Sequence, residues 1–103
     1  MTRQGNGAYV GADVVRHVRL VRPDGSVCFL TEYRGLASRG FRTDFERIPT
    51  RWLVLTYPNG RAETWTYSGS RLSAADRNWT ESLAAIAAAG GSYTDEPPPA
   101  KLR

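Results

Sequence analysis

The sequence has few of the residue types on which cross-linking, metal binding and catalysis usually depend. Its 103 residues include one cysteine, Cys28, and one histidine, His17. A single cysteine excludes an intrachain disulfide and a zinc site built on several thiolates. No stretch of about 18 apolar residues is present, the length that a membrane-spanning helix needs. We therefore expect a protein without disulfide, metal or cofactor and without a membrane segment.

A secretion signal is missing as well. Residues 1–12 are polar and rich in glycine and lack the apolar core of such a signal, so this segment is predicted to be a flexible leader. A lone cysteine agrees with a reducing compartment, and the expected location is the cytoplasm. With 41% hydrophobic residues, the chain suits a single domain.

Lysine is almost absent too. Lys101 stands against 13 arginines, and alanine is abundant with 12 residues. This bias is typical of GC-rich genomes, such as those of actinobacteria and their phages. The net charge is +4, and residues 1–51 carry all of the excess, with nine arginines against five acidic residues. Such an uneven distribution is one mark of a nucleic-acid contact.

What is present in quantity is β-prone sequence around two glycine turns. Pro23-Asp24-Gly25 and Pro58-Asn59-Gly60 each lie between two runs rich in Val, Leu, Thr and aromatic residues, which predicts two hairpins. Glycine in the third position supplies the positive φ of a type I turn followed by a bulge. The predicted strands are 14–22, 26–34, 51–57 and 61–68.

The bulged turn also fixes the register, because a shift by one residue would move apolar side chains to the polar face. In the first hairpin this register gives an apolar face that ends in an ion pair, whereas the faces of the second are less clearly sorted. The predicted pairs are Leu20 with Cys28, Val18 with Leu30, Arg16 with Glu32, His17 with Thr31 and Val15 with Tyr33, then Leu53 with Trp65 and Leu55 with Glu63.

One amphipathic helix is predicted at residues 73–89. Ser73 is a suitable N-cap, an apolar stripe recurs at helical spacing, and Gly90-Gly91 ends the helix. Residues 92–103 contain three consecutive prolines and are predicted to be a disordered tail. The expected fold of residues 13–91 is α+β, a four-stranded antiparallel sheet of two hairpins (ββ-loop-ββ) with one C-terminal helix packed on it. A curled, barrel-like sheet is the alternative.

The expected core joins the helix stripe to one face of the sheet. A single helix covers only that face, so aromatic side chains on the other face are expected to remain exposed and to mark a partner surface. The simplest partner is a second copy of the chain. The residues predicted to be largely buried are Val18, Leu20, Cys28, Leu30, Leu53, Leu55, Trp79, Leu83 and Ile86.

The segment 34–51 is the least ordinary part of the sequence and is predicted to be a long loop between the hairpins. It combines five arginines and two phenylalanines with only two acidic residues. Guanidinium groups bind phosphates and aromatic rings stack on unpaired bases, but the same phenylalanines could instead close the end of the sheet beneath solvated arginines. The candidate binding residues are Arg34, Arg39, Phe41, Arg42, Phe45, Arg47 and Arg51.

Neither His17 nor Cys28 is expected to be catalytic. A catalytic imidazole needs a second group that orients it, and the predicted register does not require one beside His17. Cys28 lies between Val27 and Phe29, where a core thiol is expected rather than a nucleophile. No two carboxylates have a spacing that brings them together. No enzymatic activity is therefore predicted.

These observations predict a small non-catalytic accessory or regulatory binding protein that acts through protein–protein contacts, with a homodimer as the simplest assembly. A nucleic-acid-binding module that uses the loop 34–51 is the alternative. The two differ in salt dependence, because phosphate contacts release counterions and weaken steeply as salt rises.

Overall fold

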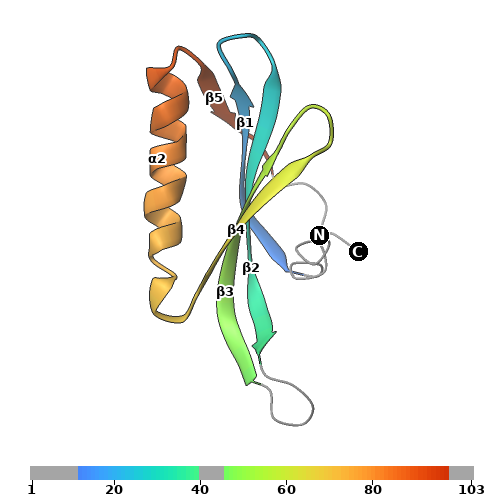
Figure 1. Cartoon of the computed structure of the whole chain (residues 1–103), viewed down its shortest axis with the longest axis vertical. Helices are drawn as coiled ribbons and strands as arrows, with labels where there is room; N and C mark the ends of the chain where they lie inside the picture. Colours follow the sequence, from blue (N-terminus) through green and yellow to red (C-terminus); the bar gives the residue numbers. More distant parts are fainter. Residues whose placement is uncertain (1–11, 40–45, 98–103) are drawn as a thin grey trace.

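The computed structural model describes residues 12–39 and 46–97. Its strands form one antiparallel sheet in the order β4-β3-β2-β1-β5, and a single long helix, α2, lies along one face (Figure 1). An α+β fold with an antiparallel sheet and one helix is thus confirmed for the described residues, but their sheet has five strands and not four. The elements are β1 (Asp13–Val21), β2 (Val27–Arg39), β3 (Glu46–Thr56), β4 (Ala62–Ser68), the 3-10 turn η1 (Gly69–Arg71), α2 (Ala74–Ala88) and β5 (Ser92–Asp95).

Both glycine turns form as predicted and use the same hydrogen bond. In the first, Gly25 has a φ of +87° and donates its N–H to the Arg22 carbonyl at 2.8 Å. In the second, Gly60 has a φ of +89° and donates its N–H to the Tyr57 carbonyl at 2.9 Å. Residues with a Cβ rarely adopt such a φ, so the glycines fix where each hairpin turns.

The predicted register of both hairpins is confirmed with one exception. A bulge between Val14 and Arg16 leaves Val15 without a partner in β2, so that Val14 rather than Val15 lies opposite Tyr33. A bulge adds one residue to a strand. Each side chain that precedes the bulge therefore points to the opposite face of the sheet from the one that it would otherwise occupy. Arg16 therefore stays opposite Glu32, as predicted, while Val14 joins the opposite face.

The described parts of the segment 34–51, residues 34–39 and 46–51, are strands and not a loop, contrary to the prediction. β2 continues to Arg39 and β3 begins at Glu46, and the two strands pair without interruption over these extensions. The extended parts of β2 and β3 project beyond the N-terminal end of α2 (Figure 1). Gly35 and Pro49 lie inside these strands, and both residue types usually argue against a strand interior, so the sequence alone favours a loop here.

The predicted disordered tail begins with a strand instead, since Ser92–Asp95 pairs with β1. α2 ends in a Schellman motif, in which Gly90 has a φ of +98° and Gly91 donates its N–H to the Ile86 carbonyl at 2.9 Å. This motif reverses the chain so closely over β1 that a Cβ on Gly91 would lie 2.4 Å from the Val21 carbonyl oxygen. The reversed chain meets the open edge of β1 and forms the fifth strand.

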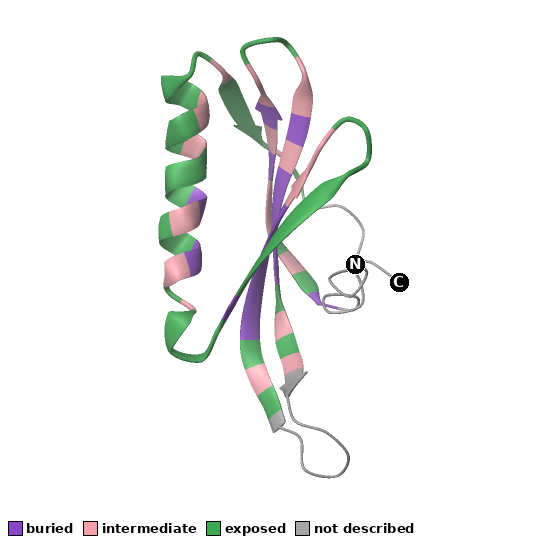
Figure 2. Ribbon diagram, in the orientation of Figure 1, coloured by how far each residue is buried: buried purple, intermediate pink, exposed green. Residues whose placement is uncertain are grey.

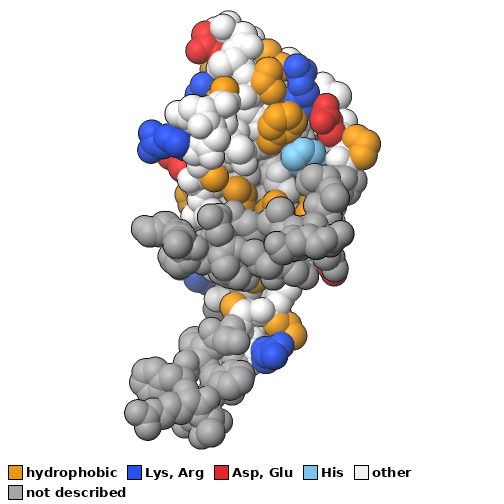
Figure 3. All heavy atoms as spheres, turned by 90° about the vertical axis from the view of Figure 1, so that its right-hand side faces the viewer, with side chains coloured by type: hydrophobic (Ala, Val, Ile, Leu, Met, Phe, Trp, Pro, Cys, Tyr) orange, Lys and Arg blue, Asp and Glu red, His pale blue; other side chains and the backbone are white. Residues whose placement is uncertain are grey.

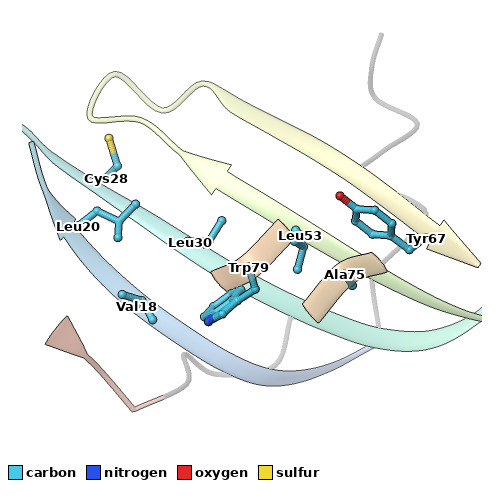
Figure 4. Close-up of a cluster of buried hydrophobic side chains, with 8 residues drawn as sticks. All are labelled: Val18, Leu20, Cys28, Leu30, Leu53, Tyr67, Ala75 and Trp79. Atoms are coloured by element: carbon cyan, nitrogen blue, oxygen red, sulfur yellow. The ribbon is translucent and has the colours of Figure 1, made fainter. Parts of the chain in front are cut away.

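The larger core lies between α2 and the side of the sheet that faces it (Figure 2, Figure 4). Ala75 and Trp79, in the first two turns of the helix, are buried. The second half of the helix contributes less, because Leu83 and Ile86 are only partly buried, as is Leu55 of β3. The strand residues of this core are Val18, Leu20, Cys28, Leu30, Leu53 and Tyr67.

A second cluster lies on the sheet face away from α2, where aromatic side chains were expected to be exposed. Trp52 is only 1% exposed and Tyr33 only 7%, so this expectation was wrong. Figure 3 shows this side of the molecule, where hydrophobic, basic and acidic side chains lie close together. Two aromatic side chains remain largely exposed, Trp65 and Tyr93. They lie opposite Leu53 and Leu20, which belong to the helix-facing side of the sheet.

The predicted leader and the end of the predicted tail lie mostly outside the described residues. Of the leader, Ala12 alone is described, and it is buried in the Tyr33–Trp52 cluster. Beyond β5, Glu96 donates its N–H to the His17 carbonyl at 3.0 Å.

A Gly91→Ala substitution tests the close approach at the end of α2. The added Cβ forces the backbone of β1 and the helix end apart, and we expect the free energy of unfolding to fall by about 1–3 kcal/mol. Ser92→Ala, at the neighbouring exposed position, should change it by less than about 0.5 kcal/mol. Urea denaturation followed by circular dichroism measures both, and equal stabilities would contradict the close approach.

Candidate functional site

A buried carboxylate lies at the centre of the helix-facing side of the sheet. Glu32 on β2 is completely inaccessible to solvent and accepts hydrogen bonds from three arginines, one on each of the three central strands. Arg16 Nε donates to its Oε1 at 2.6 Å, and Arg34 Nε and Arg51 Nε donate to its Oε2 at 2.9 and 2.5 Å. Side chains two residues apart on a strand, or opposite each other on neighbouring strands, share a face, which brings these four groups together.

The first turn of α2 joins this charged network through Asp76. Arg51 Nη2 and Arg16 Nη2 both donate to Asp76 Oδ1, at 2.6 and 2.8 Å. The guanidinium of Arg16 also lies 4.3 Å from the ring centre of Trp79, within cation–π range. Arg51 Nη1 donates to the Leu72 carbonyl at 3.2 Å. The network therefore attaches the N-terminal end of the helix to three strands.

Ion pairing sets the protonation of the network. Burial opposes ionisation of Glu32, but hydrogen bonds from Arg51, Arg16 and Arg34 outweigh it and lower the pKa of its carboxyl. Hydrogen bonding by Arg51, more than any other contact, lowers the pKa of Asp76 to about 2. The contacts with Asp76 and Glu32 in turn raise the pKa of Arg51. Both carboxylates are thus ionised at neutral pH, and arginine always is.

The charged network has little capacity left for chemistry. Both oxygens of Glu32 are occupied and shielded from solvent, and a carboxylate with a lowered pKa is a weak base. Three positive and two negative charges leave a net charge of +1. These contacts favour a structural role for the network, which holds sheet and helix in place.

An open groove lies beside α2, on the side of β4. Its two hollows, of about 290 and 310 Å³, share Leu30 and Trp65 from the sheet and Ser82 and Ala85 from the helix. Ser82 and Ala85 are small and lie on one face of the helix, so they cannot fill the space above Leu30. Trp65 forms the outer wall and is 42% exposed. We call this the α2–β4 groove.

The two edges of the sheet differ in their protection. β5 is only four residues long, and the part of β1 beyond it contains the bulge at Val15; short strands and bulges are devices that discourage pairing with other chains. β4 is seven residues long and carries one charged side chain, Glu63, and no proline. Among the described residues no strand pairs with its outer edge, so β4 is the open edge.

Of the predicted binding residues of segment 34–51, the structure describes the side chains of Arg34, Arg47 and Arg51. Arg34 and Arg51 contact Glu32, and Arg51 is buried, whereas Arg47 is exposed on the extended hairpin. The side chain of Arg39 and the residues Phe41, Arg42 and Phe45 lie outside the described part of the chain. The nucleic-acid interpretation stays a prediction, with two of its five arginines engaged in ion pairs.

His17 and Cys28 occupy the positions that the register predicts. His17 Nδ1 lies 2.7 Å from Thr31 Oγ1, and its ring stacks on Phe29 with centroids 5.2 Å apart. Burial of the ring lowers the pKa of His17, although Glu96 opposes the shift. Cys28 is buried on the helix-facing side, at the floor of the α2–β4 groove.

Sequence reasoning found part of this site and missed the rest. The pairing of Arg16 with Glu32 was predicted from the hairpin register and is confirmed. The sequence contains no signal that Asp76 pairs with these arginines, and Arg51 was predicted only as part of a basic segment. Arg51 lies two residues before the predicted core residue Leu53, and side chains at this spacing on a strand share a face. This spacing could have indicated that Arg51 lies on the core side of the sheet. No sequence signal indicated the groove, because the groove depends on where the helix lies relative to the sheet.

Comparison with protein-family models, with curated proteins and with solved structures finds no match for this chain. In residues 12–39 and 46–97, no three His, Cys, Asp or Glu side chains gather closely enough to hold a metal ion. No helix of that part is long and apolar enough to cross a membrane. What the chain does has to follow from the geometry of its groove and its open edge.

Replacing Glu32 by Gln tests the charged network. The substitution leaves three guanidinium groups around a neutral amide, and we expect a loss of about 3–5 kcal/mol in the free energy of unfolding. Glu81→Gln, at an exposed position of α2, removes the same charge and should cost less than about 0.5 kcal/mol. Chemical denaturation compares them, and similar losses for both would show that the buried charge is not required.

The network also predicts how stability depends on pH. The folded pKa of Asp76, about 2, lies below the value of about 3.9 expected for an unfolded chain. Its contribution is therefore complete above about pH 4 and is lost as pH falls towards about 2. Glu32, whose pKa is also lowered, acts in the same direction.

We accordingly expect the melting temperature of the wild type to fall through this acid range. Asp76→Asn should be less stable at neutral pH and should lose less stability on acidification, because one titrating carboxyl is gone. Thermal melts followed by circular dichroism at several pH values measure the difference. Parallel curves for wild type and variant would contradict the assignment.

Proposed function

We propose that this chain is a small non-catalytic accessory protein that acts through protein–protein contacts, and that the open edge of β4 is its contact surface. The observation that carries the proposal is the contrast between the two sheet edges. β4 presents seven residues, six of them exposed and four of them β-prone, whereas the opposite edge is short and bulged. An unprotected edge of this kind is a template for a strand from another molecule.

A non-catalytic role is supported by the state of the side chains that could carry chemistry. Glu32 is held in three ion pairs. Cys28 is buried, and an inaccessible thiol is inert. The imidazole of His17 is stacked on Phe29 and contacts the Thr31 hydroxyl.

The partner that fits this edge best is a second copy of the chain. The sequence Thr64-Trp65-Thr66 is symmetric about Trp65, so two β4 strands can pair antiparallel with the two Trp65 residues opposite each other. Each Thr64 then faces Thr66 of the second copy, and Thr–Thr and aromatic pairs stabilise a sheet. Glu63, the one charged residue of β4, then faces Tyr67 rather than another acid.

In such a dimer, the two sheets form one continuous sheet with both helices on the same face. Trp65 of the second copy lies beside Trp65 of the first, on the outer side of that residue and outside the α2–β4 groove. The contact involves only a short strand and its immediate neighbours, much less than the roughly 800 Å² per partner of a stable interface. We therefore expect weak association in the micromolar range.

Charge placed on the edge tests this proposal. We expect sedimentation velocity to show a monomer–dimer equilibrium for the wild type and a monomer for the double variant Thr64→Lys, Thr66→Lys, because lysines on a strand edge oppose pairing. The matched control is Ser92→Lys, Thr94→Lys, which adds the same charges to exposed positions of β5 on the other edge. It should associate like the wild type.

A wild type that stays monomeric at all concentrations would refute self-association through β4. Equal weakening by the two double variants would show that added charge, and not its place on β4, opposes association. Circular dichroism of each variant confirms that it is folded before it is compared.

A further inference from the structure

The inner part of the α2–β4 groove has features of a small-molecule site, beyond the protein contact proposed for β4. This part measures about 290 Å³, at the lower end of the range of roughly 300–1,000 Å³ for ligand pockets. Its walls are almost entirely apolar. Leu20, Cys28 and Leu55 come from the sheet, Ile86 comes from the helix, and Trp65 closes the outer side.

One end of this apolar space is basic. Arg22, which follows β1, lines it together with Tyr57. Nε of Arg22 donates to Ser26 Oγ at 2.8 Å, and its guanidinium lies 5.6 Å from the ring centre of Tyr57. No bond from its two terminal nitrogens to a described residue is present, so both can donate to a ligand.

The basic end opens into a recess at the two glycine turns. Arg22 and Tyr57 also line this recess, with Arg61 as a second cation and Glu63 as the one acid. The hydroxyl of Tyr57 donates to Glu63 Oε1 at 3.1 Å, which directs that carboxylate to an existing partner. Asp24 is near Arg22 but is bound to Ser26 and does not line the recess.

A narrow apolar slot that ends at a cation has the chemistry of an amphiphile-binding site. We propose that the groove binds an unbranched amphiphile with an anionic head group, such as a medium-chain carboxylate. Its chain lies between α2 and the sheet over Cys28, and its head group accepts hydrogen bonds from Arg22. Burial of each methylene favours binding, and a charge-assisted hydrogen bond fixes the direction of entry.

The helix sequence is consistent with such a slot. Ser82 and Ala85 face the groove, and larger residues at these positions would fill it. Ala84 is also small and exposed but does not line either hollow. The chain thus offers two neighbouring alanines, of which only one should matter for a ligand.

Titration with decanoate, followed by tryptophan fluorescence and calorimetry, tests the proposal. We expect saturable binding with one site per chain, and weaker binding of decyltrimethylammonium, which has the same chain and the opposite charge. Arg22→Gln should weaken decanoate at least about tenfold, the lower end of what a hydrogen bond to a charged group contributes. It should not weaken the cationic probe, because the positive charge of Arg22 opposes binding of a cationic head group. Arg19→Gln, on β1 and on the other face of the sheet, should bind decanoate like the wild type.

Filling the slot provides the second arm. Ala85→Phe should abolish binding of both probes, whereas Ala84→Phe should bind them like the wild type, and circular dichroism confirms that both are folded. Absence of saturable decanoate binding up to millimolar concentration, equal binding of the two probes, or unchanged binding in Ala85→Phe would each overturn the proposal. So would co-sedimentation with phosphatidylglycerol vesicles that persists in Ala85→Phe, since it would assign the contact to a lipid surface.

These outcomes are independent of the β4 edge. The variant Thr64→Lys, Thr66→Lys changes residues that line neither hollow and should keep its affinity for decanoate. If the protein binds decanoate but remains monomeric, the ligand site is supported and the dimer is refuted. If it dimerises but does not bind decanoate, the dimer is supported and the ligand site is refuted.

Discussion

The burial of Glu32 is the constraint on which the rest of this structure depends. An ionised carboxylate without solvent is strongly destabilising unless it is fully paired and hydrogen-bonded. Here the pairing takes Arg16, Arg34 and Arg51, and two of these arginines then require Asp76 of α2. Satisfying one buried charge therefore fixes three strands and the first turn of the helix relative to each other.

This constraint also explains why a groove exists. α2 is held at its start by Asp76 and Trp79 and at its end by the reversal of the chain at Gly91. Between these two attachments its position is set, and the side chains that face β4 are small. With Ser82 and Ala85 opposite Leu30, the helix cannot move inward to close the space, and the groove between α2 and β4 stays open.

The parts of the fold that follow from local chemistry could be predicted from the sequence. A glycine with positive φ fixes the turn, the turn fixes the register, and the register placed Arg16 opposite Glu32. Other features depend on contacts between distant segments, for which no local signal exists. These features are the placement of α2 against the sheet, the ion pairs of Asp76 and the burial of Trp52. The bulge at Val15 and the fifth strand could not be predicted for a related reason. Each depends on the position of another part of the sheet.

The positive charge of the first half takes on a different meaning in the folded chain. In the sequence it suggested a nucleic-acid contact, but Arg16 and Arg51 serve to neutralise two carboxylates, and Arg34 contacts the buried one. A guanidinium that is already bound to a carboxylate can bind an anion only by giving up that contact, whereas Arg22 keeps two terminal nitrogens without a described partner beside an apolar slot. The number of arginines is therefore a poor guide to anion binding in this protein, and the few with unused donors at a cavity are the ones on which recognition of a charged ligand would depend.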